Sequence, residues 1–160
     1  MNSEQYVTFW RRLLGPFPDW AYGVTRRGSK ELTYLKARAI ENRLDDVVGP
    51  ENWWPKYTPT ARGYTCALTL RVPTEEGWKF VTKEDGGGFE DMGQKDRATG
   101  EWETDQDADE KSGYTNAFRR AAKAWGFGRE LYMEGVPSYL SDLFNAPSCT
   151  PPEVVKGTRG

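Results

Sequence analysis

Histidine is absent from this sequence of 160 residues, and cysteine occurs twice. Without an imidazole group, histidine-based acid–base catalysis is excluded, and without a cluster of cysteine and histidine a zinc site is not expected. Cys66 lies in an alternating apolar segment and Cys149 in a proline-rich tail, so we expect two free thiols in a reducing compartment. We predict a protein that is not an enzyme and holds neither a metal ion nor another cofactor.

Long apolar runs are missing as well. No stretch approaches the roughly 20 consecutive apolar residues that span a bilayer, and the N-terminus lacks the apolar core of a signal peptide. The glycine-rich loop that binds nucleoside triphosphates is also absent. These absences predict a cytoplasmic protein that does not contact a membrane and does not use ATP.

Charge is present in both signs but is distributed unevenly. Residues 1–50 hold 8 basic and 6 acidic side chains, residues 51–110 hold 7 and 14, and residues 111–160 hold 7 and 4. A polyanion responds to the local field of a groove rather than to the average charge of the chain. The net charge of −2 therefore leaves room for a basic groove.

The first half of the chain reads as short helices and strands. An amphipathic helix is predicted from an N-cap at Ser3 to a stop at residues 15–16. Two strands joined by a turn at residues 27–29 follow, and apolar residues at helical spacing predict a second helix over residues 35–48.

Three further strands are predicted after this helix. Residues 53–60 contain two prolines, which suit an edge strand, whereas residues 64–72 and 77–84 alternate between apolar and polar positions. Together they predict an antiparallel β-meander, and with the next helix a β-β-β-α core in an α+β fold. Trp78 and Trp125 fall on apolar faces and are expected in the core.

The remaining segments lack an apolar period. Residues 85–110 are strongly acidic and predict a mobile loop or a weak hairpin extension. A short helix is expected from Pro137. We predict one domain over residues 1–145 and a disordered tail over residues 146–160.

One segment concentrates positive charge. A helix is predicted over residues 112–125, and the glycines of residues 126–128 are expected to end it. In this helix Arg119, Arg120 and Lys123 lie on one side, opposite a small and aromatic face. No acidic residue lies three or four positions from these cations. The stripe predicts either an anionic ligand or contacts with the carboxylates of residues 84–110 or of a neighbouring subunit, and the residues leave both interpretations open.

Several blocks resemble the Rad fifty-two/Rad twenty-two family of single-strand-annealing recombination proteins, in particular its short bacterial and phage members. The blocks are GYTNAFRRAAKAWGFGRELY, YLKARAIENRLDDVVGPENWW, YTCALTLRV, GWKFVTKEDGGG and PFPDWAYGV. They occur in the family's order and cover roughly residues 10–135.

The resemblance implies single-stranded DNA binding and annealing in recombination and double-strand break repair. It implies rings or helical homo-oligomers that assemble through the strand-rich stem, in a bacterial or phage-infected cell. It places the phosphate contacts on Arg119 and Arg120, followed by Lys123, with Arg38 as the nearest match to a basic residue of the family's first helix. A single-strand-binding protein is a candidate partner.

Other charged residues allow further interpretations. Lys79 and Lys83 share one strand face, from which we infer an extension of the groove. A protein-interaction module without DNA activity is the main alternative, and a metal-dependent nuclease is a weaker one, with Glu84, Asp85, Glu90 and Asp91 as its candidate metal ligands. The spacing of Asp105, Asp107 and Asp109 resembles a calcium loop but lacks its glycine and final glutamate, so we predict a solvated acidic segment there.

Overall fold

The computed structural model describes residues 2–88, 94–95, 102–103, 106–132 and 135–145. It is an α+β fold in which an antiparallel three-stranded meander packs against a long helix, as the sequence predicts. The helices are α1 (Ser3–Leu14), α2 (Ala37–Val47), α3 (Gln106–Trp125) and α4 (Ser141–Phe144). The strands are β1 (Tyr22–Arg27), β2 (Lys30–Leu35), β3 (Trp53–Thr60), β4 (Gly63–Thr74), β5 (Gly77–Gly88), β6 (Gln94–Lys95) and β7 (Trp102–Glu103).

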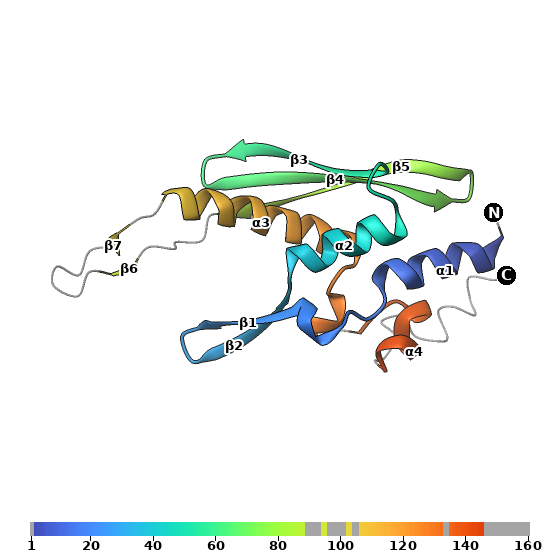
Figure 1. The fold of residues 1–160 in the computed structure, drawn as a ribbon, viewed down its shortest axis with the longest axis horizontal. Coiled ribbons are helices and arrows are strands. Elements are labelled where there is room, and N and C mark those ends of the chain that lie inside the picture. The colour runs from blue at the N-terminus through green and yellow to red at the C-terminus, as the bar shows by residue number, and fades with distance from the viewer. Residues whose placement is uncertain (1, 89–93, 96–101, 104–105, 133–134, 146–160) are drawn as a thin grey trace.

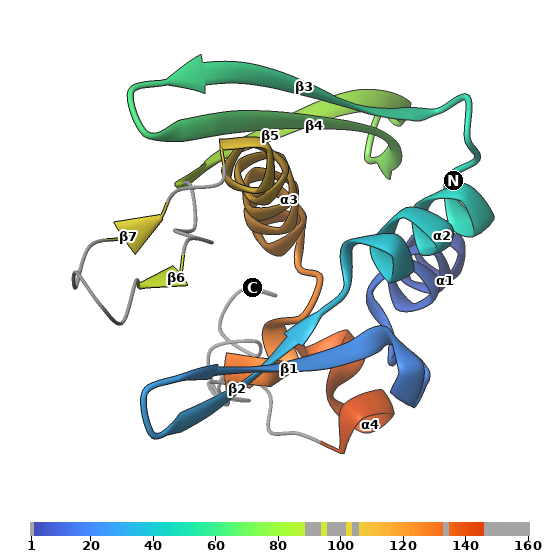
Figure 2. The same cartoon turned by 60° about the vertical axis from the view of Figure 1, so that its left-hand side comes forward.

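Three layers follow one another in the molecule. The β3-β4-β5 sheet forms the first layer, α3 lies beneath it, and the β1–β2 hairpin lies on the far side of α3 (Figures 1 and 2). Helices α1 and α2 pack beside α3 and close one end of the core. None of the helices in the described part of the chain is long and apolar enough to cross a membrane.

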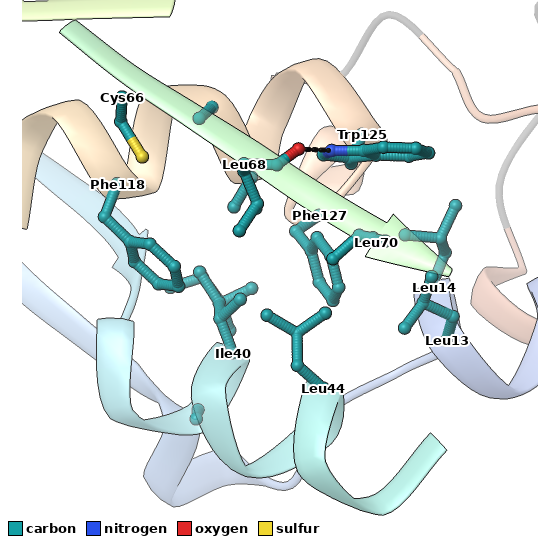
Figure 3. Packing of buried hydrophobic residues seen from close by; sticks show 14 of the residues in the cluster. Leu13, Leu14, Ile40, Leu44, Cys66, Leu68, Leu70, Phe118, Trp125 and Phe127 are labelled. Carbon is teal, nitrogen blue, oxygen red and sulfur yellow. Dashed lines mark hydrogen bonds between the residues drawn. The ribbon is translucent and has the colours of Figure 1, made fainter. Parts of the chain in front are cut away.

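The central strand β4 carries the core of the sheet. Its inward residues Cys66, Leu68 and Leu70 are fully buried, which confirms the alternation predicted from the sequence. They meet apolar side chains of α1, α2 and α3, among them Leu13, Ile40, Leu44 and Phe118 (Figure 3). The Trp125 indole also donates a hydrogen bond of 3.0 Å to the Leu68 carbonyl, so α3 is tied to β4 by a polar contact inside the apolar core.

The prolines of β3 stand where they do not interrupt the sheet. The Asn52 carbonyl accepts a hydrogen bond from the Arg71 amide, so the residues of β3 that bond to β4 are Trp54 and every second residue after it. Pro55 and Pro59 fall on the alternate positions, where the missing N–H would have pointed away from the sheet. The edge position predicted for this strand is confirmed.

The outer face of the sheet corrects one expectation. Trp78 is 45% exposed, although the apolar alternation of β5 placed it in the core. The alternation itself is right, but the face that carries Trp78 and Phe80 points away from α3, and Val81 is the β5 side chain that packs on the core. Trp53 and Trp54 are adjacent in β3 and point to opposite faces, so Trp53 is half-buried against Phe118 and Trp54 is exposed.

Two helix starts differ from the prediction. Asn2, rather than Ser3, is the N-cap of α1, in a capping box with Gln5. Helix α3 begins at Gln106, six residues before the predicted start, and β5 continues to Gly88. Acidic residues in a first turn are favoured by the helix dipole, a signal that an apolar period does not reveal. The acidic loop is therefore shorter than residues 85–110; the rest of it, apart from the short β6–β7 ladder, and the predicted tail lie outside the described residues.

A glycine run at the end of β5 lets the strand cross α3 closely. A Cβ atom built on Gly87 would lie 2.5 Å from the Ala117 amide nitrogen and 2.7 Å from the Asn116 carbonyl carbon. Both neighbours are helix backbone and cannot rotate away. Any side chain at position 87 would therefore push β5 and α3 apart.

We expect Gly87→Ala to lower the free energy of unfolding by roughly 1–3 kcal/mol, because the added methyl group would clash with helix backbone atoms that cannot move aside as a side chain can. Gly86→Ala is the matched control, since its Cβ would meet its nearest atoms at 3.8 Å and 3.9 Å. Urea unfolding followed by circular dichroism measures both variants. Equal stability of the two would contradict the close approach.

Candidate functional site

A groove with a volume of about 600 Å³ lies between α3 and the β1–β2 hairpin. Strand β5 contributes its floor through Gly87 and Gly88, where the glycine crossing leaves backbone rather than side chains. The hairpin contributes Thr25, Leu32, Thr33, Tyr34 and Leu35, and α3 contributes Asn116, Arg119, Arg120 and Lys123. The two walls thus differ in character, since one is hydroxylated and apolar and the other is cationic.

The cationic wall follows from the periodicity of α3. Ala117, Phe118, Ala121, Ala122 and Trp125 are buried against the sheet and α2, and a different side of the helix faces the hairpin. Arg119, Arg120 and Lys123 are brought together there, and among the described residues that line the groove none is acidic. Helical periodicity predicts that these three residues share one side of the helix, and the structure places them together on that side.

Arg119 is held on two sides. Its Nη2 donates a hydrogen bond of 2.7 Å to the Asn116 Oδ1, and its guanidinium carbon lies 4.9 Å from the centre of the Tyr34 ring. Asn116 in turn donates through its Nδ2 to the Gly88 carbonyl at 3.2 Å. The guanidinium is therefore connected to both walls of the groove.

Arg120 has a different neighbour. Its Nε lies 3.4 Å from Asp85 Oδ1, and its side chain is 62% exposed. Asp85 also accepts a hydrogen bond of 2.7 Å from the Gly86 amide, which fixes the carboxylate at the end of β5. The interpretation that the stripe meets acidic partners thus holds for Arg120, and an exposed pair of this kind contributes little stability.

The end of α3 is shaped by the predicted glycine stop. Gly126 and Gly128 have φ angles of +116° and +79°, in the left-handed region that favours glycine. Between them Phe127 turns inward and is buried. This turn carries Phe127 and Leu131 to the end of the groove, where they line it beyond Lys123.

Three of the predicted DNA-binding residues lie outside this groove. Arg38 is exposed in the first turn of α2 and is not a lining residue. Lys79 forms an ion pair with Glu76 near the β4–β5 turn, about 26 Å along the strand from Gly87 at the usual rise per residue. Lys83 donates to the Ala124 carbonyl at 3.4 Å and lies over the Trp125 ring, which places it against the end of α3.

The described residues contain no group of three or more potential ligand side chains that could hold a metal ion. The residues that resembled a calcium loop are divided, because Asp107 and Asp109 belong to helix α3. Asp105, Glu90 and Asp91 lie outside the described residues. Cys66 is a free and buried thiol, and burial raises its pKa to about 11, so it is protonated at neutral pH.

Sequence reasoning missed Tyr34 and Asn116, and it included Asp85 only as part of the acidic segment that could meet the basic stripe. Tyr34 appeared as part of a strand, Asn116 as a neutral residue of the helix and Asp85 as the start of a loop. Their roles depend on the cross-strand register and on the glycine crossing. The one available signal was the position of Asn116 three residues before Arg119, on the same helix face.

Comparison of the chain with models of known protein families finds no match, and comparison with curated proteins finds none either. The family resemblance accordingly remains an interpretation of the motif residues.

Proposed function

We propose that the chain binds single-stranded DNA in the groove between α3 and the β1–β2 hairpin and anneals complementary strands without ATP. The observation that carries the proposal is the set of three cations from one helix, Arg119, Arg120 and Lys123, along a groove of about 600 Å³. Arginine suits phosphate because its planar fork can donate two parallel hydrogen bonds to phosphate oxygens.

The chemistry of the groove fits backbone binding better than base readout. Annealing requires that a strand be held by its phosphates while its bases stay free to pair. The α3 wall offers charge to phosphates, and the hairpin wall offers the Thr25 hydroxyl and the exposed Leu32 side chain, which suit sugars. Binding of this kind is independent of sequence and sensitive to salt.

The motif resemblance supports the same proposal and extends it. It implies a homo-oligomer, a ring or a helical filament, assembled through the β3-β4-β5 stem, so that grooves of successive subunits form a longer track. A single-strand-binding protein would be a partner in the cytoplasm of a bacterium or phage-infected cell. Arg38, Lys79 and Lys83 remain candidate DNA contacts from such an assembly.

A protein-interaction module is the second candidate. The exposed ring pair of Trp54 and Phe80, with centroids 5.3 Å apart on the outer face of the sheet, favours a protein contact. Aromatic side chains are enriched at protein interfaces. The Arg120–Asp85 pair also supports this alternative, because a carboxylate lies beside Arg120 where an anionic ligand would otherwise bind.

The proposed function predicts a loss of annealing in Arg119→Ala/Arg120→Ala. Two fluorescent complementary oligonucleotides, mixed without nucleotide, report the annealing rate, and a labelled single strand reports affinity at several salt concentrations. We expect the slope of log K against log salt to become shallower by about 1.4, since each phosphate contact on a single strand contributes about 0.7.

Arg12→Ala/Lys56→Ala is the charge-matched control, because both side chains are exposed and neither lines the groove. Its slope and annealing rate should stay near those of the wild type. If both double variants weaken binding equally, the effect is one of overall charge and the groove assignment fails. If the folded wild type does not bind single strands even at low salt, the proposed function is wrong.

The Arg120–Asp85 pair predicts a gain of affinity in Asp85→Asn. The amide keeps the shape of the carboxylate and can still accept from the Gly86 amide, but it no longer competes with phosphate for Arg120. An exposed pair is worth up to about 1 kcal/mol, which sets the gain at roughly fivefold or less. Glu84→Gln, next to it and exposed, removes the same charge without touching Arg120, and an equal gain there would contradict the pairing.

A further inference from the structure

Arg119 and Arg120 are adjacent in sequence but are held in different ways. Arg120 meets one carboxylate at 3.4 Å from a mostly exposed position. Arg119 is half-buried, donates a hydrogen bond of 2.7 Å to Asn116 Oδ1 and lies over the Tyr34 ring. Of the two, only Arg119 joins the two walls of the groove through contacts described in the structure.

The Asn116 amide has its orientation fixed by its partners. Its Oδ1 faces the Arg119 guanidinium, which can only donate, and its Nδ2 faces the Gly88 carbonyl, which can only accept. A flipped amide would lose both hydrogen bonds. Because Gly88 directly follows the crossing at Gly87, the position of Asn116 is tied to the contact between β5 and α3.

The Tyr34 ring is held within its own hairpin. Gly23 is its cross-strand partner, and a Cβ atom there would lie 2.5 Å from Tyr34 Cζ and 2.6 Å from its Oη. The ring therefore occupies the space that a side chain at position 23 would fill. The Arg119 guanidinium carbon lies over the same ring, 4.9 Å from its centre, and such a position over an aromatic face is one that arginine favours.

We propose that Asn116 and Tyr34 are positioning residues that hold the Arg119 guanidinium ready for a phosphate group of single-stranded DNA. This inference rests on the proposed function of the groove. A long side chain that is already ordered does not lose rotamer freedom when the ligand arrives, so Arg119 provides the preorganised contact. Arg120 provides a second contact after it leaves Asp85.

The first test does not involve DNA. The Arg119 Nε–Hε signal in a ¹⁵N NMR spectrum, assigned with Arg119→Lys, should be a single signal displaced by the ring current of Tyr34. Tyr34→Leu should remove the displacement, and Tyr34→Phe, which keeps the ring, should retain it. Gly23→Ala should resemble Tyr34→Leu because it displaces the ring. An Arg119 signal unchanged in Tyr34→Leu would overturn the positioning role of Tyr34.

The second test measures binding of a fluorescent oligothymidylate. Asn116→Ala and Tyr34→Leu should each weaken binding by about fivefold in the wild-type background, and by less than about twofold in an Arg119→Ala background, since both act through that guanidinium. Tyr34→Phe should bind like the wild type. Thermal unfolding of each variant checks that the fold is intact, and Asn116→Ser serves if Asn116→Ala does not fold.

The outcomes separate the two proposals. Equal losses in the wild-type and Arg119→Ala backgrounds would mean that Asn116 or Tyr34 contacts DNA directly, which overturns the positioning role alone. Absence of oligonucleotide binding by the wild type would overturn the proposed function and the phosphate role of Arg119 with it. The NMR displacement would in that case still report whether the guanidinium is held.

Discussion

The backbone contact between Gly87 and the Asn116–Ala117 turn of α3 sets the arrangement of everything around it. It fixes the distance between the sheet and the helix, and so it decides how far Leu68 and Leu70 reach into the apolar side of α3. The same contact places Gly88 within reach of Asn116 and brings Asp85 beside Arg120. The packing between sheet and helix and the arrangement of charges in the groove therefore both depend on Gly87, which has no side chain.

Much of this fold is readable from local patterns in the sequence. The alternation of β4, the prolines of the edge strand and the glycines after Trp125 each have a local physical cause, and each was predicted correctly. The cationic side of α3 was equally predictable, because helical periodicity places residues on faces without reference to the rest of the chain. Trp78 was placed wrongly because alternation separates the two faces of a strand but does not indicate which face packs on the helix.

The other features that the sequence did not predict share a physical origin. Tyr34 faces Arg119 because of the β1–β2 register and the missing side chain at Gly23, two facts about residues far from α3 in sequence. The early start of α3 at Gln106 depends on charge near a helix end rather than on an apolar period. Features that depend on two elements meeting in space are the ones that single-sequence patterns do not contain.

The prolines of β3 also affect what can happen at the border of the sheet. A free strand edge invites another chain to pair with it through its outward N–H and C=O groups. Along β3 the outward positions alternate with those bonded to β4, and two of them, Pro55 and Pro59, have no N–H to offer. A foreign strand approaching this border would find a broken row of donors. The β3 border is thereby protected against uncontrolled edge-to-edge aggregation, while the β5 border contains no proline to block a neighbour.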